Sequence, residues 1–171
     1  MGVQGPPRDV GPCFVYFNGT SVGETHGGVQ FRYALQSTEV HEDSKGVEPV
    51  DDILIGATCE VDVEMTRMAI ARLAEVTPGA SGSGTAGNIM LVKQVVGQSQ
   101  YNNARKLVLK PIVNGVASAD TTEWITVFRA APTPAYELPY TVTDQRTYKV
   151  TFKAYRVLAG ANAGKLWKMG A

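Results

Sequence analysis

Apolar and polar residues alternate along several stretches of the chain, which is the pattern of β-strands that bury one face. In residues 29–35 the apolar side chains take every second position, and in residues 60–65 valine and methionine alternate with acids. A third alternation covers residues 147–158, with Tyr148, Val150, Phe152 and Ala154 opposite Lys149, Thr151, Lys153 and Tyr155. Shorter apolar runs at 13–17, 89–96, 105–113 and 124–128 bring the prediction to about seven strands.

One segment has helical character. Residues 66–76 are rich in alanine and place apolar side chains on one side, with Thr66 as the expected N-cap. Pro78 and Gly79 end this helix, and a Gly/Ser-rich linker is expected over residues 77–88. Irregular structure is expected for an N-terminal arm at 1–11, for a polar loop at 98–104, for the loop at Pro132 and Pro134, and for a C-terminal tail at 159–171 anchored by Trp167.

These elements predict a single, mainly β domain over residues 1–171, built as a sandwich or barrel with one flanking helix. Asn18 with Gly19 and Asn114 with Gly115 are tight-turn signals. Gly56 interrupts a strand-like run and predicts a β-bulge.

The connection between the strands at 29–35 and 53–65 is longer than a hairpin turn requires. We expect a long acidic loop over residues 36–52, with the alternative that the strand at 29–35 runs on to Val40. A loop of this length usually reaches toward another surface. Its charged and polar members are the candidate contact residues: Glu39, His41, Glu42, Asp43, Lys45, Glu48, Asp51 and Asp52.

Charge is balanced over the whole chain but uneven along it. Sixteen basic residues match sixteen acidic ones, so no overall field draws the protein to nucleic acid or to a membrane. Residues 39–64 hold nine acids and one base, whereas residues 105–171 hold ten bases and four acids. This polarity suits a protein whose acidic side meets the basic side of another copy, and two differently charged solvated faces would give the same pattern.

Three acids, Glu60, Asp62 and Glu64, fall on one face of one strand. Like charges in a row repel each other, so this face is expected to be wet or to meet bases across the sheet. A cluster of metal ligands is the less favoured interpretation of the same spacing. Lys106, Lys110, Lys149 and Lys153 form a basic stripe without the interleaved aromatic residues typical of single-strand binding, Tyr155 excepted.

No motif for catalysis, metal binding or cofactor binding emerges, and we expect a protein that is not an enzyme. Residues 82–87 match G-x-G-x-x-G, but the helix precedes the motif and a strand follows it, the reverse of a dinucleotide site. His26 and His41 are expected in polar loops, away from any nucleophile or metal pattern. Cys13 and Cys59 are expected as buried free thiols, with one disulfide left open. No leader or long apolar run indicates membrane insertion.

Several features together suggest a family. A short first strand ends in the turn at Asn18, the segment from Gly23 to Phe31 reads GETHGGVQF, and residues 49–56 read PVDDILIG. An alternating strand, one helix and a β-rich second half follow. Nearly the whole chain therefore resembles the major tail tube protein of long-tailed bacteriophages and related phage-like particles.

The resemblance implies a structural subunit of the virion tail, assembled in the cytoplasm of the bacterial host. Such subunits join in rings, typically hexameric, through continuous β-sheet around a channel that delivers DNA, and the long loop and the termini connect one ring to the next. The resemblance makes residues 36–52 the inter-ring contact and Glu60, Asp62 and Glu64 candidates for the channel wall, where a negative surface would repel phosphate. Lys106 and Lys110 mark an alternative wall.

The expected partners are other copies of the chain, a tape-measure protein, a tail terminator, baseplate or tail-tip proteins, a sheath protein where the tail contracts, and DNA in passage. Two other classes remain open. One is a different virion component, such as a tail terminator or a capsid decoration protein. The other is a monomeric β-barrel that binds a small ligand, or an enzyme with an unrecognised site.

Overall fold

The computed structural model describes residues 11–41, 49–67, 69–83, 89–93, 96–143 and 145–170. Strands make up 58% and helices 9% of the described structure, which confirms the mainly β class. No helix in these ranges is both long and apolar enough to span a membrane. The strands are β1 (Cys13–Phe17), β2 (Thr20–Ser21), β3 (Glu24–His41), β4 (Pro49–Arg67), β5 (Ala80–Ser83), β6 (Ile89–Val92), β7 (Arg105–Val113), β8 (Val116–Ala117), β9 (Ile125–Tyr136), β10 (Tyr148–Ala154) and β11 (Trp167–Met169).

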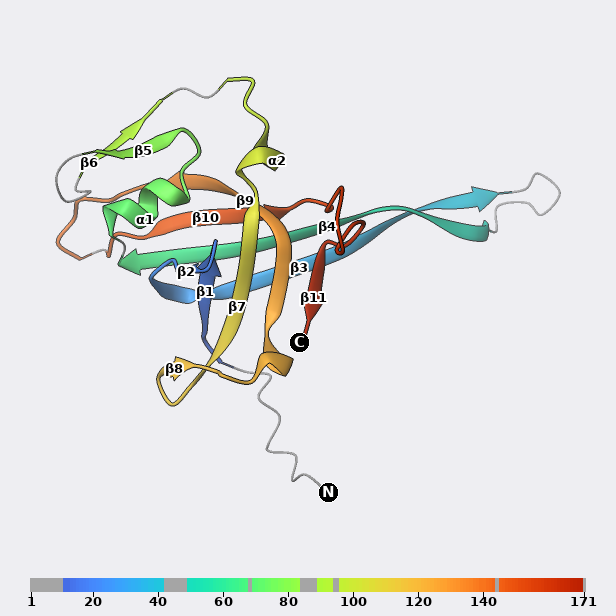
Figure 1. Cartoon of the computed structure of the whole chain (residues 1–171), viewed down its shortest axis with the longest axis horizontal. Helices are drawn as coiled ribbons and strands as arrows, with labels where there is room; N and C mark the ends of the chain where they lie inside the picture. The colour runs from blue at the N-terminus through green and yellow to red at the C-terminus, as the bar shows by residue number, and fades with distance from the viewer. Residues whose placement is uncertain are drawn as a thin grey trace.

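One large antiparallel sheet organises the fold. Its strands follow the order β2-β1-β7-β9-β10-β4-β3, with β11 added to β9 and β8 added to β7. In Figure 1 the group formed by β1, β7 and β9 crosses the group formed by β10, β4 and β3 at a steep angle, and β9 bends from one group into the other. The sheet therefore folds over on itself, and β1, next to the first strand, approaches the last strand, β3.

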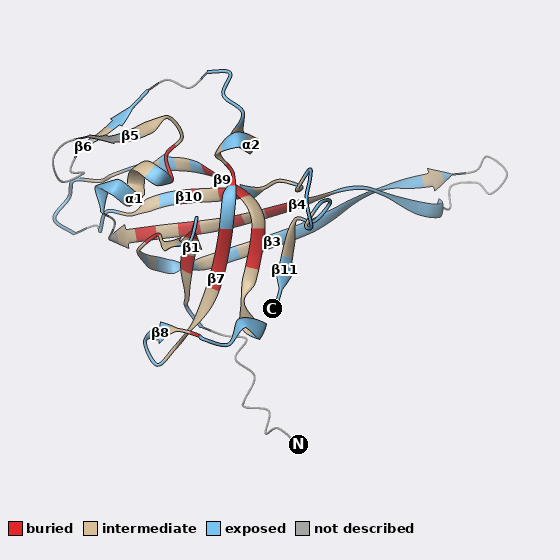
Figure 2. Cartoon of the chain, in the orientation of Figure 1, coloured by how far each residue is buried: buried red, intermediate tan, exposed pale blue. Residues whose placement is uncertain are grey.

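The core lies where the two strand groups face each other. Phe17 of β1 and Phe152 of β10 pack with their ring centroids 5.2 Å apart. The predicted alternation in β10 is confirmed, because Val150 and Phe152 are buried while Lys149 and Lys153 are exposed. Buried positions concentrate on the central parts of β1, β4, β7, β9 and β10 (Figure 2).

Two predicted turns are confirmed. Asn18 and Asn114 both have a φ of +52°, and the glycines that follow them have φ values of +83° and +80°. Two consecutive residues in this left-handed region match the type I′ turns that join adjacent antiparallel strands, and asparagine followed by glycine adopts them at the lowest cost.

The predicted helix over residues 66–76 is wrong at its beginning. Strand β4 continues to Arg67, and the helix α1 covers only Ile70–Glu75, without the expected cap from Thr66. The ladders explain this, since Tyr148 of β10 pairs with Met65 and Glu24 of β3 pairs with Arg67, which holds the end of β4 extended. A second short helix, α2 (Gln100–Asn103), lies within the predicted polar loop at 98–104, and the 3₁₀ turn η2 covers Thr121–Glu123.

Other predicted boundaries also move. Strand β9 passes through Pro132 and Pro134, where a loop was expected. Prolines two residues apart direct their missing N–H groups to the same edge, so the ladder with β10 on the other edge is left intact. Part of the predicted linker at 77–88 forms β5, which pairs with β6, and β6 ends at Val92 rather than residue 96. Strand β10 ends at Ala154, four residues before the predicted end at Leu158. The N-terminal arm lies outside the described residues, except for Gly11.

The C-terminal tail is anchored as predicted. Trp167 begins β11, which pairs with β9. Its ring packs edge-on against Phe31 and Tyr33 of β3, with centroid separations of 5.0 and 5.5 Å. The end of the chain therefore covers β3 at the place where that strand leaves the body of the protein.

Candidate functional site

The most prominent feature of the surface is a two-stranded arm. Strands β3 and β4 continue together well beyond the other strands, as Figure 1 shows on its right side. The predicted loop over residues 36–52 is therefore wrong in its described parts, because the ladder continues from Gln36 opposite Gly56 to His41 opposite Pro49. Both strands contain β-branched residues that favour extended structure, and the pairing satisfies their backbone groups.

The predicted contact residues divide into two sets. Glu39 and His41 lie on β3, and Asp51 and Asp52 lie on β4, all near the end of the arm. Glu42, Asp43, Lys45 and Glu48 lie outside the described residues.

A β-bulge interrupts the arm where Gly56 predicted one. Gln36 pairs with Gly56 and Ser37 pairs with Leu54, so Ile55 is an additional residue on β4. A bulge bends the strand and increases its twist. Because of the extra residue, Leu54 comes to lie on the same side of the hairpin as Tyr33 and Leu35.

The arm exposes large apolar side chains. Tyr33 and Leu35 continue the row of Val29 and Phe31, which packs against the core, but their exposed fractions are 42% and 57%. On the other strand, Leu54 and Ile55 are 64% and 65% exposed. Contiguous exposed apolar side chains on a protein surface usually mark a contact with another molecule. The apolar side of the hairpin, which faces the core near the body, thus continues into the arm, where the core no longer covers it.

The end of the arm also carries unfavourable charge pairs. Glu39 lies directly opposite Asp52 in the ladder, and Asp51 follows opposite Val40. Like charges at directly opposed positions destabilise a strand pair. His41 Nε2 lies 3.2 Å from Glu39 Oε2 and relieves the repulsion only when the imidazole is protonated. A basic surface on another molecule would relieve it as well.

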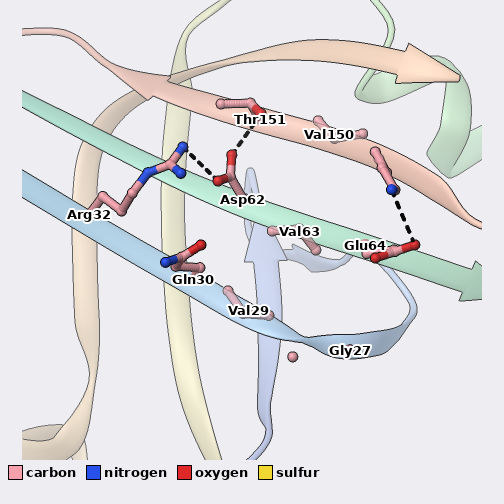
Figure 3. Close-up of a pocket in the computed structure, with 11 residues that line it drawn as sticks. Gly27, Val29, Gln30, Arg32, Asp62, Val63, Glu64, Val150 and Thr151 are labelled. Carbon is pink, nitrogen blue, oxygen red and sulfur yellow. Dashed lines mark hydrogen bonds and ion pairs between the residues drawn. The ribbon is translucent and has the colours of Figure 1, made fainter.

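The predicted row of acids lies on the other side of the same hairpin, nearer to the body. Arg32 of β3 contacts Asp62 at 2.6 Å (Figure 3). It also contacts Glu60 at 3.4 Å. The hydroxyl groups of Thr151 and Thr147 donate to Asp62 and Glu64, each at 2.7 Å. The expectation that this face is wet or meets bases across the sheet is confirmed by the contacts of Arg32 and Lys149.

This charged face is close to neutral. The ladders place Arg32 opposite Glu60, Lys153 opposite Glu60 from the other side, and Lys149 opposite Glu64. Lys149 Nζ lies 3.9 Å from a Glu64 oxygen. Three bases therefore accompany three acids on one face, a compensation that the alternation in residues 60–65 does not reveal.

An open groove of about 630 Å³ lies on this face. Its floor opens where β3 bulges at Gly27 and Gly28 (Figure 3). Thr25 pairs with Met65 and Val29 pairs with Val63, so β3 has three residues there where β4 has one. The acids that line it, Asp62 and Glu64, already contact Arg32, Lys149 and the two threonines. Most charged groups of the groove are thus already paired with each other or hydrogen-bonded, and few are available to bind a ligand.

The remaining candidate residues form no site. His26 and His41 lie on β3 rather than in loops. Among the described residues, no group of three or more His, Cys, Asp or Glu side chains could hold a metal ion. Lys110 lies over the rings of Tyr16 and Trp124, at 4.3 and 3.8 Å from their centroids, so its aromatic neighbours come from other strands. Most of the 82–87 glycine motif lies outside the described residues.

Both cysteines are free thiols, as expected. Cys59 is buried and Cys13 is half-buried. Burial raises the pKa of each thiol from 9.0 to about 11, with Glu60 as a second cause at Cys59. The thiols are therefore protonated and poorly nucleophilic at neutral pH. Cys59 faces Tyr33 in the ladder and is the last buried residue of β4 before the arm leaves the body.

The sequence matches no model of a known protein family, and it matches no curated protein. The function must therefore be inferred from the arm, the sheet edges and the charged face.

Sequence reasoning missed the apolar side of the arm. The sequence pattern places Leu35 on the core face of one strand and Ile53, Leu54 and Ile55 in the next, but it does not show whether other strands cover them. The available signal was an apolar run placed directly beside an acidic, turn-rich segment at the presumed tip.

Proposed function

We propose that this chain is a structural subunit that assembles with its own copies into stacked rings, as a phage tail tube does. The observation that carries the proposal is the β3–β4 arm, whose core-facing side remains apolar and exposed beyond the body. The resemblance in the order of sequence elements supports the same function. The tube would form part of a virion tail and conduct DNA into the host.

The arm has the properties of a contact element between copies. Leu54 and Ile55 supply apolar area, and the opposed Glu39 and Asp52 supply negative charge near the end. The second half of the chain is rich in bases, so the arm of one copy can dock on a basic surface of another. A contact between two different surfaces repeats without limit along an axis, which produces a filament of stacked rings.

The face with Glu60, Asp62 and Glu64 is our candidate for the channel wall. It lies on the outer side of β3, β4 and β10, away from the core. Because Arg32, Lys149 and Lys153 share this face, the wall would be nearly neutral rather than strongly negative. Passing DNA would then meet paired charges that are already satisfied, which limits its adhesion without strong repulsion.

The partners would be other copies of the chain, a tape-measure protein inside the tube, and the terminator, baseplate or tip proteins at its ends. A sheath protein would be added where the tail contracts. None of these functions requires a cofactor.

Electron microscopy of the purified protein tests the proposal. We expect rings or tubes whose length increases with protein concentration. The decisive variant replaces residues 38–53 by Asn-Gly, which closes the hairpin between Ser37 and Leu54 with a two-residue turn. This variant should remain folded, as judged by circular dichroism, and should fail to form long tubes.

A matched control changes a distant hairpin turn, Asn114 and Gly115, which has the backbone conformation expected for the Asn-Gly turn of the shortened arm. Replacing these two residues by Gly-Asn should leave polymerisation normal. A wild-type chain that stays monomeric at all concentrations would exclude the tube. Tubes of normal length from the shortened arm would show that the arm does not connect the rings.

A further inference from the structure

The four strands β9, β10, β4 and β3 form one part of the sheet, and its two ends differ. Strand β3 forms one end. Over its 18 residues it is paired on one edge with β4. Within the described part of the chain no ladder occupies its other edge, although β1 approaches it. A long free edge of this kind accepts a strand from another chain.

The opposite end of this part, the second half of β9, is closed. The ladder of β9 with β7 stops at Ala130, and beyond it the ladder with β10 continues to Tyr136. Pro132 and Pro134 lack the N–H groups that a further strand would need at this edge. The turn after α1 covers the same region, because the Thr77 hydroxyl lies 2.8 Å from the Tyr136 hydroxyl and Pro132 is fully buried.

The ribbon of β5 and β6 lies at this closed end. It packs against α1, and Thr77, Pro78 and Gly79 connect it to the turn that covers β9. A two-stranded ribbon is marginally stable on its own. Its strand β6 exposes Ile89, Leu91 and Val92 to 52%, 52% and 58%, and it lies on the outer side of the ribbon in the view of Figure 1.

We infer that β6 of one copy adds as a further strand to the free edge of β3 in the neighbouring copy, along residues 32–36. This inference deepens the proposed function by naming the lateral joint of the ring. Ile89 and Leu91 are two residues apart and share one side of β6, as Tyr33 and Leu35 share one side of β3. Side chains of adjacent strands lie next to each other on a common face, so the two exposed apolar rows would cover each other.

The location of the two surfaces explains why a ring would close. The free edge of β3 and the ribbon lie at opposite ends of the β9-β10-β4-β3 part of the sheet. A contact that joins opposite ends of identical copies is head-to-tail, and it closes into a ring when the rotation between copies divides a full turn. The joint therefore passes through the ribbon, because Pro132 and Pro134 prevent a continuous ladder from β3 to the neighbouring β9.

The test is the double substitution Ile89→Lys with Leu91→Lys, which places two charges in the joint. Both side chains are half-exposed in the single chain, so the variant should fold with an unchanged circular dichroism spectrum. We expect at least a tenfold loss of ring-forming protein in size-exclusion chromatography with light scattering. The matched control is Val116→Lys on β8, which is 64% exposed and should assemble normally.

The outcomes separate this inference from the proposed function. If the wild-type chain does not assemble, both are overturned. If the wild-type chain and the double variant form the same rings, the lateral joint through β6 is overturned, and the tube proposal stands. If Val116→Lys is as defective as the double variant, the effect is general and the inference is likewise overturned.

Hydrogen exchange supplies a second measurement that does not depend on a folded variant. In residues 32–36, the amides that face the free edge should exchange at least about tenfold more slowly in assembled wild-type protein than in diluted subunits. The amide of Tyr136, which faces the closed edge of β9, should exchange equally in both states, because that edge has no joint. Equal exchange of the β3 amides in rings and in subunits would contradict the inference.

Discussion

The two halves of the β3–β4 hairpin have the same ladder and opposite environments. Near the body, Val61 and Val63 are 1% and 2% exposed, covered by the other strands of the sheet. Beyond Cys59, Leu35 and, after the bulge, Leu54 lie on the same side of the hairpin but are 57% and 64% exposed. The side chains are equally apolar, so the difference comes from what packs against them. An apolar row that continues past its own core is suited to a core completed by another molecule.

The boundary between the two halves is sharp. Trp167 covers Phe31 and Tyr33 from the C-terminal strand β11, and no contact of this kind is found further along the described arm. Beyond Trp167, the bulge at Ile55 and Gly56 changes the register, and the opposed acids follow. The first half should therefore determine the stability of the subunit, whereas the second half should determine its assembly.

The largest effect on stability is expected from Phe152→Ala, in the core that covers the first half of the hairpin. Phe152 is fully buried and packs on Phe17, so we expect a loss of about 3–5 kcal/mol in the free energy of unfolding. Leu54→Ala, on the arm, should change it by less than about 0.5 kcal/mol. Urea denaturation of diluted subunits measures both. Similar losses at the two positions would refute the division of the hairpin.

An intermediate effect is expected at the boundary. Trp167→Ala removes both aromatic contacts with β3 and should cost about 2 kcal/mol, less than a fully buried tryptophan because Trp167 is half-buried. Trp167→Phe keeps an aromatic ring and should recover more than half of the loss. Hydrogen exchange at residues 31–33 should increase in the alanine variant. Unchanged stability in that variant would place the boundary elsewhere.

The smallest effect is expected on the charged face. Asp62→Asn removes the 2.6 Å ion pair with Arg32, but the Arg32 side chain is 49% exposed and that of Asp62 is 33% exposed. Solvent screening limits the cost to about 0.2–1 kcal/mol. The cost should disappear in 1 M salt, where the Debye length is about 3 Å. Glu60→Gln, at the longer 3.4 Å contact, is the matched control and should cost less. A loss that persists in high salt would indicate a structural rather than electrostatic role.

Much of the fold follows from local patterns in the sequence. Alternation located the central parts of β3, β4 and β10, and asparagine followed by glycine located two turns. Gly56 located the bulge. These signals are local, since a strand with one buried face must alternate and a left-handed turn favours asparagine and glycine.

Boundaries were less predictable where pairing overrides local preference. Thr66 and Arg67 remain extended because β3 pairs with β4 up to Arg67, opposite Glu24, although the following residues favour a helix. Pro132 and Pro134 are tolerated in β9 because that strand is paired on one edge there. The acidic segment around Glu39 and Asp52 stays paired although turn-forming residues surround it.

The sequence by itself determined the mainly β class, the alternation of buried and exposed positions, and the concentration of acids in residues 39–64. Only the tertiary structure decided that the connection is a paired arm and that bases compensate Glu60, Asp62 and Glu64. It also decided that, among the described strands, β3 keeps a free edge while that of β9 is closed. The physical reason is that alternation depends on the strand's own geometry. Coverage, charge pairing and edge closure depend instead on which distant strands come to lie alongside.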